Sequence, residues 1–379
     1  MTGREELVDA ARALGPVLRE RSRETETLRR IPDETIADLQ AAGLFKVLQP
    51  ACYGGDEADL GTSYEIVLAL SAADGSVGWV YSVLLVQTWA VSLMDPAASK
   101  EVWGSDPSAL ISSAVAPRSG YIDKVADGYR IKAQFGFSSG CHHATWVFVL
   151  GVPRNAPEEG FCGFLVPRGE YEIVDNWNVM GLCGTGSCDV AVDSTVPPHR
   201  VHSVVKTGSE VSDAPIYQLP FFQVFPPAAV VPLVGTAQGA LDEYLVQQKD
   251  RARITGGTVG SEPSSQIRVA ESAADLDAAR LTLFRNCAGL TQLAASGDPL
   301  PPELLARVNR DQVLASRSAV RAVDRVFANA GARALSLDNP IQRAWRDVHA
   351  GAAHPASVPD APLAAYGAQA FGVDPTSSH

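Results

Sequence analysis

Two short segments carry the side chains best suited to chemistry. Residues 180–189, MGLCGTGSCD, place Gly186 and Ser187 in a glycine-rich turn, and the alternating residues that follow are typical of a strand. A dinucleotide-binding loop is disfavoured, because that motif opens a helix. Residues 346–355, RDVHAGAAHP, place His349 and His354 near the end of a predicted helix. Because imidazole changes charge near neutral pH, either ring can donate a hydrogen bond or accept a proton.

A third segment, residues 137–146, reads FSSGCHHATW. Ser138 and Ser139 are expected to face opposite sides of a strand, so only one of them can reach a bound group. The same alternation separates Cys141 from His142, and the six cysteines show no C-x-x-C spacing. We therefore predict no metal site, and we expect His142 and His143 at a surface or subunit contact.

Hydrophobic periodicity predicts the elements that hold these segments. One long amphipathic helix is expected over residues 5–28, and a second from residues 32–33 to Gly43, where glycine allows a left-handed cap. The periodicity changes to short strands, with a tight turn at Asp127-Gly128. Further helices are expected over 60–74, 77–94, 96–103, 266–295 and 302–330. The predicted units are an N-terminal helical domain (1–109), a central β domain (110–210) and a C-terminal helical bundle (211–379).

Composition excludes several classes of function. With 379 residues, 46% of them hydrophobic, the chain can bury a large core. Its net charge of −12 disfavours binding to nucleic acid or to an anionic membrane surface. The apolar residues 77–94 contain polar side chains and lack basic flanks, so we interpret them as a buried helix. The N-terminus lacks a secretory signal and the cysteines are scattered, which favours a cytoplasmic protein that acts on small molecules.

The order of helices, small sheet domain and helical bundle resembles the acyl-CoA dehydrogenase superfamily. Four segments carry the resemblance over nearly the whole chain: residues 44–60 (LFKVLQPACYGGDEADL), 137–146, 180–192 and 345–355. The chain looks closest to the oxygenase components of two-component flavin monooxygenases, a branch that includes hydroxylases of phenols and indoles. The resemblance implies a mainly α fold with a central β domain and a C-terminal four-helix bundle.

The resemblance also implies roles for individual residues. Many acyl-CoA dehydrogenases carry a basic Glu where an ungapped count from Arg346 places Pro355, and proline cannot act as a base. In the oxygenase branch a histidine in this region lies near the reactive edge of the flavin. We assign this role to His354, with His349 as second choice. Ser139 is expected at the polar edge of the flavin ring. The remaining residues expected around the ring are Phe137, Ser138, Trp146, Gly186 and Ser187.

The outer parts of the flavin and the substrate are assigned in the same way. Arg253 and Gln266 resemble the positions that hold the pyrophosphate and adenine of a flavin on a neighbouring subunit, which favours reduced FAD over FMNH2. Because members of the fold are usually tetramers, the resemblance also implies a homotetramer. The expected substrate-binding residues are Gln87, Ser112, Ser113 and His354. Gln87 stands where relatives often have histidine, and an amide can orient a substrate but cannot titrate.

The implied reaction starts with reduced flavin from a separate NAD(P)H-dependent reductase. Oxygen then forms a C4a-hydroperoxyflavin, which hydroxylates an electron-rich phenol or indole inside a water-excluding pocket. Three alternatives stay open: an acyl-CoA dehydrogenase with a displaced base, an amine N-oxygenase similar to the nitrososynthases, and a non-catalytic scaffold.

Overall fold

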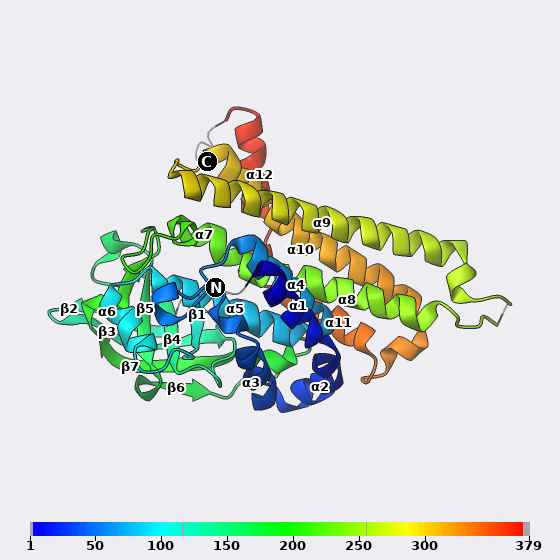
Figure 1. The fold of residues 1–379 in the computed structure, drawn as a ribbon, viewed down its shortest axis with the longest axis horizontal. Helices are drawn as coiled ribbons and strands as arrows, with labels where there is room; N and C mark the ends of the chain where they lie inside the picture. The colour runs from blue at the N-terminus through cyan, green and yellow to red at the C-terminus, as the bar shows by residue number, and fades with distance from the viewer. Residues whose placement is uncertain (1–2, 116, 255, 374–379) are drawn as a thin grey trace.

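The computed structural model describes residues 3–115, 117–254 and 256–373. Along the chain, helices come first and last and the strands lie between them. In space, the strands lie at one end of the elongated molecule (Figure 1). The N-terminal helices are α1 (Arg4–Ala13), α2 (Gly15–Leu28), α3 (Asp33–Ala41), α4 (Leu60–Ala73), α5 (Gly75–Ser92) and α6 (Pro96–Trp103). The helices predicted at 60–74, 77–94 and 96–103 are thereby confirmed.

The single helix predicted over residues 5–28 is wrong, because the chain breaks between α1 and α2. Pro16 occupies the first turn of α2, where its missing N–H removes no helical hydrogen bond. An uninterrupted helix would have needed that N–H. The helix predicted to stop at Gly43 is confirmed: α3 ends at Ala41, and Gly43 has a φ of 73°.

The strands form two four-stranded sheets, with orders β1-β4-β5-β8 and β2-β3-β7-β6. β1 and β4 pair in parallel and the other pairs are antiparallel. Apolar side chains from both sheets, among them Phe135, Phe164 and Val190, make a core separate from that of the helices. The bounds are β1 (Ile111–Val115), β2 (Pro117–Val125), β3 (Gly128–Ser138), β4 (Trp146–Gly151), β5 (Cys162–Pro167), β6 (Tyr171–Val174), β7 (Cys188–Val196) and β8 (Val201–Ser203).

The end of β3 is irregular, and this irregularity shapes the site. The pairing of β3 with β7 shifts register between Phe135 and Ser138. Phe137 lies within the shift and has a φ of 65°, a left-handed conformation that costs energy for a residue with a side chain. The chain then leaves the sheet through a turn that contains Ser139 and Gly140.

Helices α8, α9 and α10 run side by side away from the sheets (Figure 1). The helices predicted over 266–295 and 302–330 are confirmed. The segment Phe221–Gln248 is long and apolar enough to span a membrane, but 78% of its apolar window is buried inside the protein, as expected of a core helix. The C-terminal helices are α7 (Phe221–Val224), α8 (Val231–Gln248), α9 (Pro263–Ser296), α10 (Pro302–Ala330), α11 (Pro340–Ala352) and α12 (Asp360–Ala370).

We propose the unit boundaries 1–109, 110–210 and 211–379 for this chain. The strands of both sheets fall between Ile111 and Ser203, in support of the central unit. The core of the helices is continuous between the two terminal units, since Leu70 of α4 and Leu233 of α8 belong to one cluster. The two helical units therefore depend on each other for burial.

Candidate active site

A chain of buried hydroxyl groups joins three of the predicted segments. Trp79 Nε1 of α5 donates to Ser139 Oγ at 3.1 Å. Ser139 Oγ lies 2.7 Å from Ser187 Oγ, which lies 2.7 Å from Thr185 Oγ1. Thr185 Oγ1 donates to the Leu182 carbonyl at 2.8 Å. The structure therefore brings the predicted residues Ser139 and Ser187 into direct contact.

The carbonyl at the end of the chain fixes the direction of these hydrogen bonds. Each hydroxyl has one proton, and Thr185 gives its proton to a carbonyl, which can only accept. Ser187 must then donate to Thr185, and Ser139 must donate to Ser187. Ser139 Oγ has two lone pairs, and one of them accepts the hydrogen bond from Trp79. The other lone pair is left for a ligand. A ligand that meets Ser139 must offer a donor.

His354 lies at the same place, with its ring centroid 5.8 Å from that of Trp79 and nearly perpendicular to it. His354 Nδ1 accepts from the backbone N–H of Ala356 at 3.1 Å and caps the short helix Pro355–Ser357. Burial lowers the pKa of His354 to about 4, so the ring is neutral at neutral pH. Because Nδ1 is an acceptor, the proton sits on Nε2.

The middle of α11 holds the glycine-rich loop, so residues 180–189 and residues 346–355 are in direct contact. Asp347 Oδ1 accepts from the backbone N–H of Leu182 at 2.6 Å, and Arg346 Nη1 donates to the Met180 carbonyl at 2.6 Å. At Gly181 an added Cβ would stand 2.2 Å from the Arg346 carbonyl oxygen, so glycine alone fits. Arg346 and Asp347 are thus positioning residues for the loop that carries Thr185 and Ser187.

Asp347 provides a pH-dependent prediction. Burial, together with repulsion from Asp74, raises the pKa of Asp347 to about 7, whereas the unfolded chain has the ordinary value near 4. The folded protein therefore binds more protons than the unfolded chain between about pH 4 and pH 7, and its stability falls as pH rises through this window. Asn at this position can still accept from Leu182 but does not ionise.

In Asp347→Asn, we expect the unfolding free energy relative to wild type to rise by on the order of 3 kcal/mol between about pH 4 and pH 8. Urea denaturation at a series of pH values measures this difference. A difference that stays constant across the series would show that Asp347 is ionised throughout and would contradict the prediction.

Phe137, two residues before Ser139 in the chain, carries an exposed aromatic ring. Its side chain is 62% exposed, unusual for phenylalanine. The Arg118 guanidinium lies 4.4 Å from the ring centroid, and the Trp177 ring meets it edge-on at 6.1 Å. A planar ligand can pack here, and the strained backbone of Phe137 is of the kind found at binding sites.

A second set of predicted residues lies deeper, where α5 packs against β1. Ser138 Oγ donates to Ser112 Oγ at 3.2 Å, so Ser138 and Ser139 do point to different partners, as predicted. Ser113 is buried. Gln87 is fully buried, and both its amide atoms have no hydrogen-bond partner among the described residues. An unsatisfied buried amide costs about 1–3 kcal/mol, which points to a missing partner.

Other predicted residues lie outside these sets in the chain. His349 Nε2 lies 2.9 Å from Asp324 Oδ1 on the surface of the bundle. Trp146 packs under the Arg200 guanidinium, 5.2 Å from its ring centroid. Neither residue joins Ser139. Gly186 lies in the loop itself with a φ of 53°.

Arg253 lies in the connection between α8 and α9, and Gln266 lies in the first turn of α9. The connection between these helices is at the far end of the bundle from the sheets (Figure 1). Arg253 pairs with Glu262, and Gln266 Nε2 donates to the Gly260 carbonyl at 3.0 Å. Both residues are remote from Ser139 within one chain. Only a neighbouring subunit could bring them to a shared ligand.

Two expectations about the segment after Ser139 are wrong. Cys141 and His142 do not point apart, because β3 ends at Ser138 and the following residues form a turn. Their ligand atoms lie close to that of Cys188. The side chain of His143 is buried, and its Nδ1 lies 3.4 Å from Asp33 Oδ1, whereas His142 is exposed as expected.

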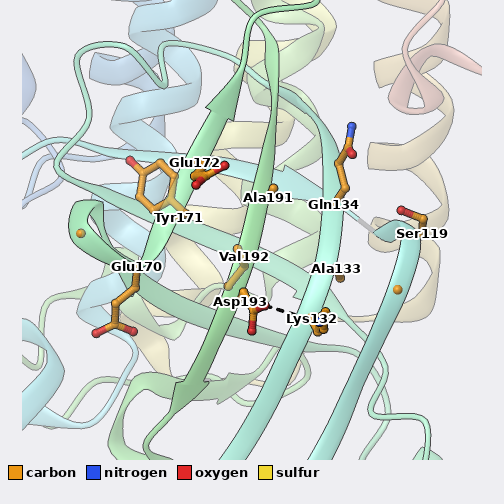
Figure 2. Close-up of a pocket in the computed structure, with 12 residues that line it drawn as sticks. Ser119, Lys132, Ala133, Gln134, Glu170, Tyr171, Glu172, Ala191, Val192 and Asp193 are labelled. Carbon is orange, nitrogen blue, oxygen red and sulfur yellow. Dashed lines mark ion pairs between the residues drawn. The ribbon is translucent and has the colours of Figure 1, made fainter.

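A hollow of about 620 Å³ lies on the outer face of the sheet β2-β3-β7-β6 (Figure 2). It is lined by residues such as Gln134, Glu170 and Asp193 and contains none of the predicted site residues. Its side chains do not converge on a reactive group. We therefore place the site at the hydroxyl chain instead.

Sequence reasoning missed several residues of the site, above all Trp79, Thr185 and Asp347. Trp79 was counted only as part of an apolar helix, although a buried indole N–H needs a partner. Asp347 follows Arg346 in the predicted helix, and its residue type alone does not reveal a contact with a distant loop. Thr185 lay within the glycine turn, where its hydroxyl gave no separate signal.

Comparisons with known proteins identify the family of this chain. A family model described as acyl-CoA dehydrogenase, C-terminal domain, matches residues 228–359. The oxygenase subunit HsaA of a flavin-dependent monooxygenase from Rhodococcus jostii is 41% identical, over 97% of this chain and 98% of its own length. The oxygenase component of an FADH2-dependent resorcinol hydroxylase from Rhizobium is 32% identical, over 98% and 96%. The crystal structure of a 3-HSA hydroxylase from Rhodococcus has a TM-score of 0.93 at 40% identity and 97% coverage of both chains.

The fold and the full-length relatives define a flavoprotein of the acyl-CoA dehydrogenase fold. The relatives that match nearly the full length of the chain identify the family within this class. The chain belongs to the oxygenase components of flavin-dependent monooxygenases, enzymes that take reduced flavin from a separate source and react it with O2.

Proposed function

We propose that this enzyme hydroxylates an electron-rich aromatic compound, a phenol or an indole, with reduced FAD and O2. A separate NAD(P)H-dependent reductase supplies the reduced flavin. The observation that carries the proposal is the hydroxyl chain, which leaves Ser139 Oγ as an acceptor. Phe137, two residues earlier in the chain, carries an exposed aromatic ring. The names of the relatives, which include FADH2-dependent and phenol-hydroxylating enzymes, support the choice of flavin and substrate class.

The residues fit reduced flavin better than oxidised flavin. Reduced flavin carries a proton on N5, which is a donor for the lone pair left on Ser139 Oγ, whereas oxidised N5 is itself an acceptor. Phe137 supplies a flat wall for the ring. When bound, reduced flavin supplies the electrons that activate O2 for transfer of one oxygen atom to the substrate.

His354 acts in this proposal as a hydrogen-bond donor through Nε2. A ring with a pKa near 4 is a weak base, so it does not remove a proton from a phenol at neutral pH. Its N–H can instead stabilise negative charge that develops on oxygen, and its ring helps Trp79 to exclude water. With Pro355 at the neighbouring position, α-proton abstraction from an acyl-CoA gains no support.

Gln87 is proposed to bind the polar group of the substrate, with Ser112 and Ser113 on β1 beside it. Gln87 stands about 12 Å further along α5 than Trp79, at 1.5 Å per residue. One helix thus carries a contact for the hydroxyl chain and one for the substrate. Its orphaned amide supports this role, because a phenol or an indole N–H would satisfy it.

Arg253 and Gln266 are proposed to hold the outer part of FAD across a subunit contact in a cytoplasmic homotetramer. An arginine fork suits a pyrophosphate. In the single chain Arg253 is paired with Glu262, so binding of the phosphate must displace or share this ion pair.

Anaerobic titration with FADH2, FMNH2 and oxidised FAD tests the flavin assignment. We expect FADH2 to bind most tightly. Mixing that complex with 18O2 and either resorcinol or indole should give a product with one labelled oxygen, detected by mass spectrometry. Failure to bind any reduced flavin, or conversion of an acyl-CoA to its enoyl-CoA without aromatic product, would overturn the proposal.

A further inference from the structure

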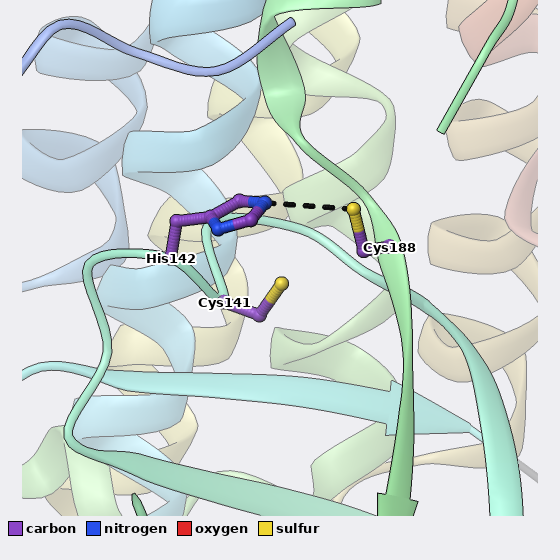
Figure 3. A group of neighbouring side chains, drawn as sticks. All are labelled: Cys141, His142 and Cys188. Carbon is purple, nitrogen blue, oxygen red and sulfur yellow. Dashed lines mark hydrogen bonds between the residues drawn. The ribbon is translucent and has the colours of Figure 1, made fainter. Parts of the chain in front are cut away.

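A cluster of two thiols and one imidazole lies beside the hydroxyl chain and has no part in it (Figure 3). Cys141 and His142 come from the turn after β3, and Cys188 is the first residue of β7. Cys188 Sγ lies 3.5 Å from His142 Nε2. Each of the three residues offers one ligand atom, and these atoms all lie within 4.8 Å of one another.

These separations are close to those around a tetrahedral metal ion. Zn²⁺ holds thiolate sulfur at about 2.3 Å and imidazole nitrogen at about 2.0 Å, so its ligand atoms stand roughly 3.5–3.8 Å apart. The distance from Cys188 to His142 already falls there, and the other two distances need to shorten by no more than about 1 Å.

The burial of the three residues also suits a bound ion. Both cysteines are buried, which shields the sulfurs, whereas His142 is exposed and leaves a route for the ion from solvent. Asp175 Oδ1 lies 3.9 Å from Cys188 Sγ and can complete the coordination directly or through water. Asp175 is itself held by Arg29, whose Nη2 lies 2.9 Å from Oδ2.

The donor set is of the kind that thiophilic cations prefer. Cys141 Sγ donates to the Gly186 carbonyl at 3.4 Å, and Cys188 Sγ lies beside His142 Nε2. Thiolate is the form of cysteine that binds metals, so a bound ion would displace the thiol protons.

We propose that Cys141, His142 and Cys188 form a binding site for a thiophilic divalent cation, with Zn²⁺ as the best match. This proposal is independent of the proposed substrate and flavin, and it replaces our expectation of no metal site. Ser139 lies two residues from Cys141, and Ser187 is the neighbour of Cys188. A bound ion would fasten the turn to β7 and so hold both ends of the Ser139–Ser187 contact.

The test uses the full-length protein, treated with chelator and kept reduced, and titrated with Zn²⁺ by calorimetry and with Co²⁺ by absorption spectroscopy. We expect one ion per chain, a thiolate-to-cobalt charge-transfer band and a higher midpoint of thermal unfolding. Cys188→Ser should abolish the band, and His142→Ala should weaken Zn²⁺ binding at least tenfold. Because His142 is exposed, its replacement leaves the core intact and the test valid even if a cysteine variant misfolds.

The matched control is Cys52→Ser, which removes an exposed cysteine outside the cluster and should bind both ions as the wild type does. Three results would overturn the proposal: no saturable binding to the reduced protein, a cobalt spectrum without a thiolate band, or equal Zn²⁺ affinity in the wild type, Cys188→Ser and His142→Ala.

Discussion

In His354→Ala, we expect the product formed per reduced flavin consumed to fall at least tenfold, with hydrogen peroxide making up the balance. A single well-placed donor is worth about 10²–10³ in rate where charge develops on oxygen. His354 offers Nε2–H in a neutral ring, and among the described residues this atom has no hydrogen-bond partner. The change also opens the edge of Trp79 to water. Product and peroxide are quantified in the same single-turnover reaction.

His354→Asn separates catalysis from folding. Asparagine is a good helix N-cap, so it can still accept from the Ala356 N–H and hold the short helix Pro355–Ser357. It lacks the second ring nitrogen. We therefore expect stability near that of the wild type. The coupling, meaning the product formed per reduced flavin consumed, should be as low as in His354→Ala. Recovered coupling in the asparagine variant would mean that His354 acts only as a cap.

His349→Ala tests the second choice for this role. His349 pairs with Asp324 on the surface and packs against the Trp345 ring at a tilt, with 4.5 Å between ring centroids. We expect its replacement to change the coupling less than twofold, within the spread typical of surface substitutions.

Gln87→Met should stabilise the protein and weaken substrate binding at the same time. Methionine has a similar length but no amide, so the buried unsatisfied atoms disappear and stability rises by about 1–2 kcal/mol. The lost hydrogen bond should weaken binding of a phenolic ligand about tenfold, equal to 1.4 kcal/mol. Thermal unfolding without ligand and equilibrium binding measure the two effects.

The control for Gln87→Met changes the ligand and keeps the two proteins the same. An analogue with a methyl group in place of the phenolic hydroxyl should bind the wild type and Gln87→Met equally, because neither protein can form the hydrogen bond with it. If Gln87→Met weakens the two ligands to the same extent, the effect comes from the shape of the pocket. If the variant is less stable than the wild type, the amide has a partner within the protein.

Much of the candidate site could be predicted from the motifs that carry the family resemblance. The segments around Ser139, Ser187 and His354 were singled out as the flavin edge, and the structure joins the first two directly and sets the third against Trp79, the partner of Ser139. Trp146 and His349 lie elsewhere. Both residues belong to the same motifs as the site residues, so the sequence pattern could not separate them from the site. The direction in which a side chain points at the end of a strand or a helix depends on packing.

The sequence by itself determined the order and type of the elements, because apolar periods of 3.6 and 2 residues and the glycine and proline positions are local properties. It also determined the absence of a base at Pro355. The tertiary structure decided the break before α2, the bulge at Phe137, the gathering of Cys141, His142 and Cys188, and the lone pair left on Ser139. Each of these depends on groups distant in the chain that meet only in the packed protein, where a hydrogen bond or a close contact fixes one arrangement among several that the sequence permits.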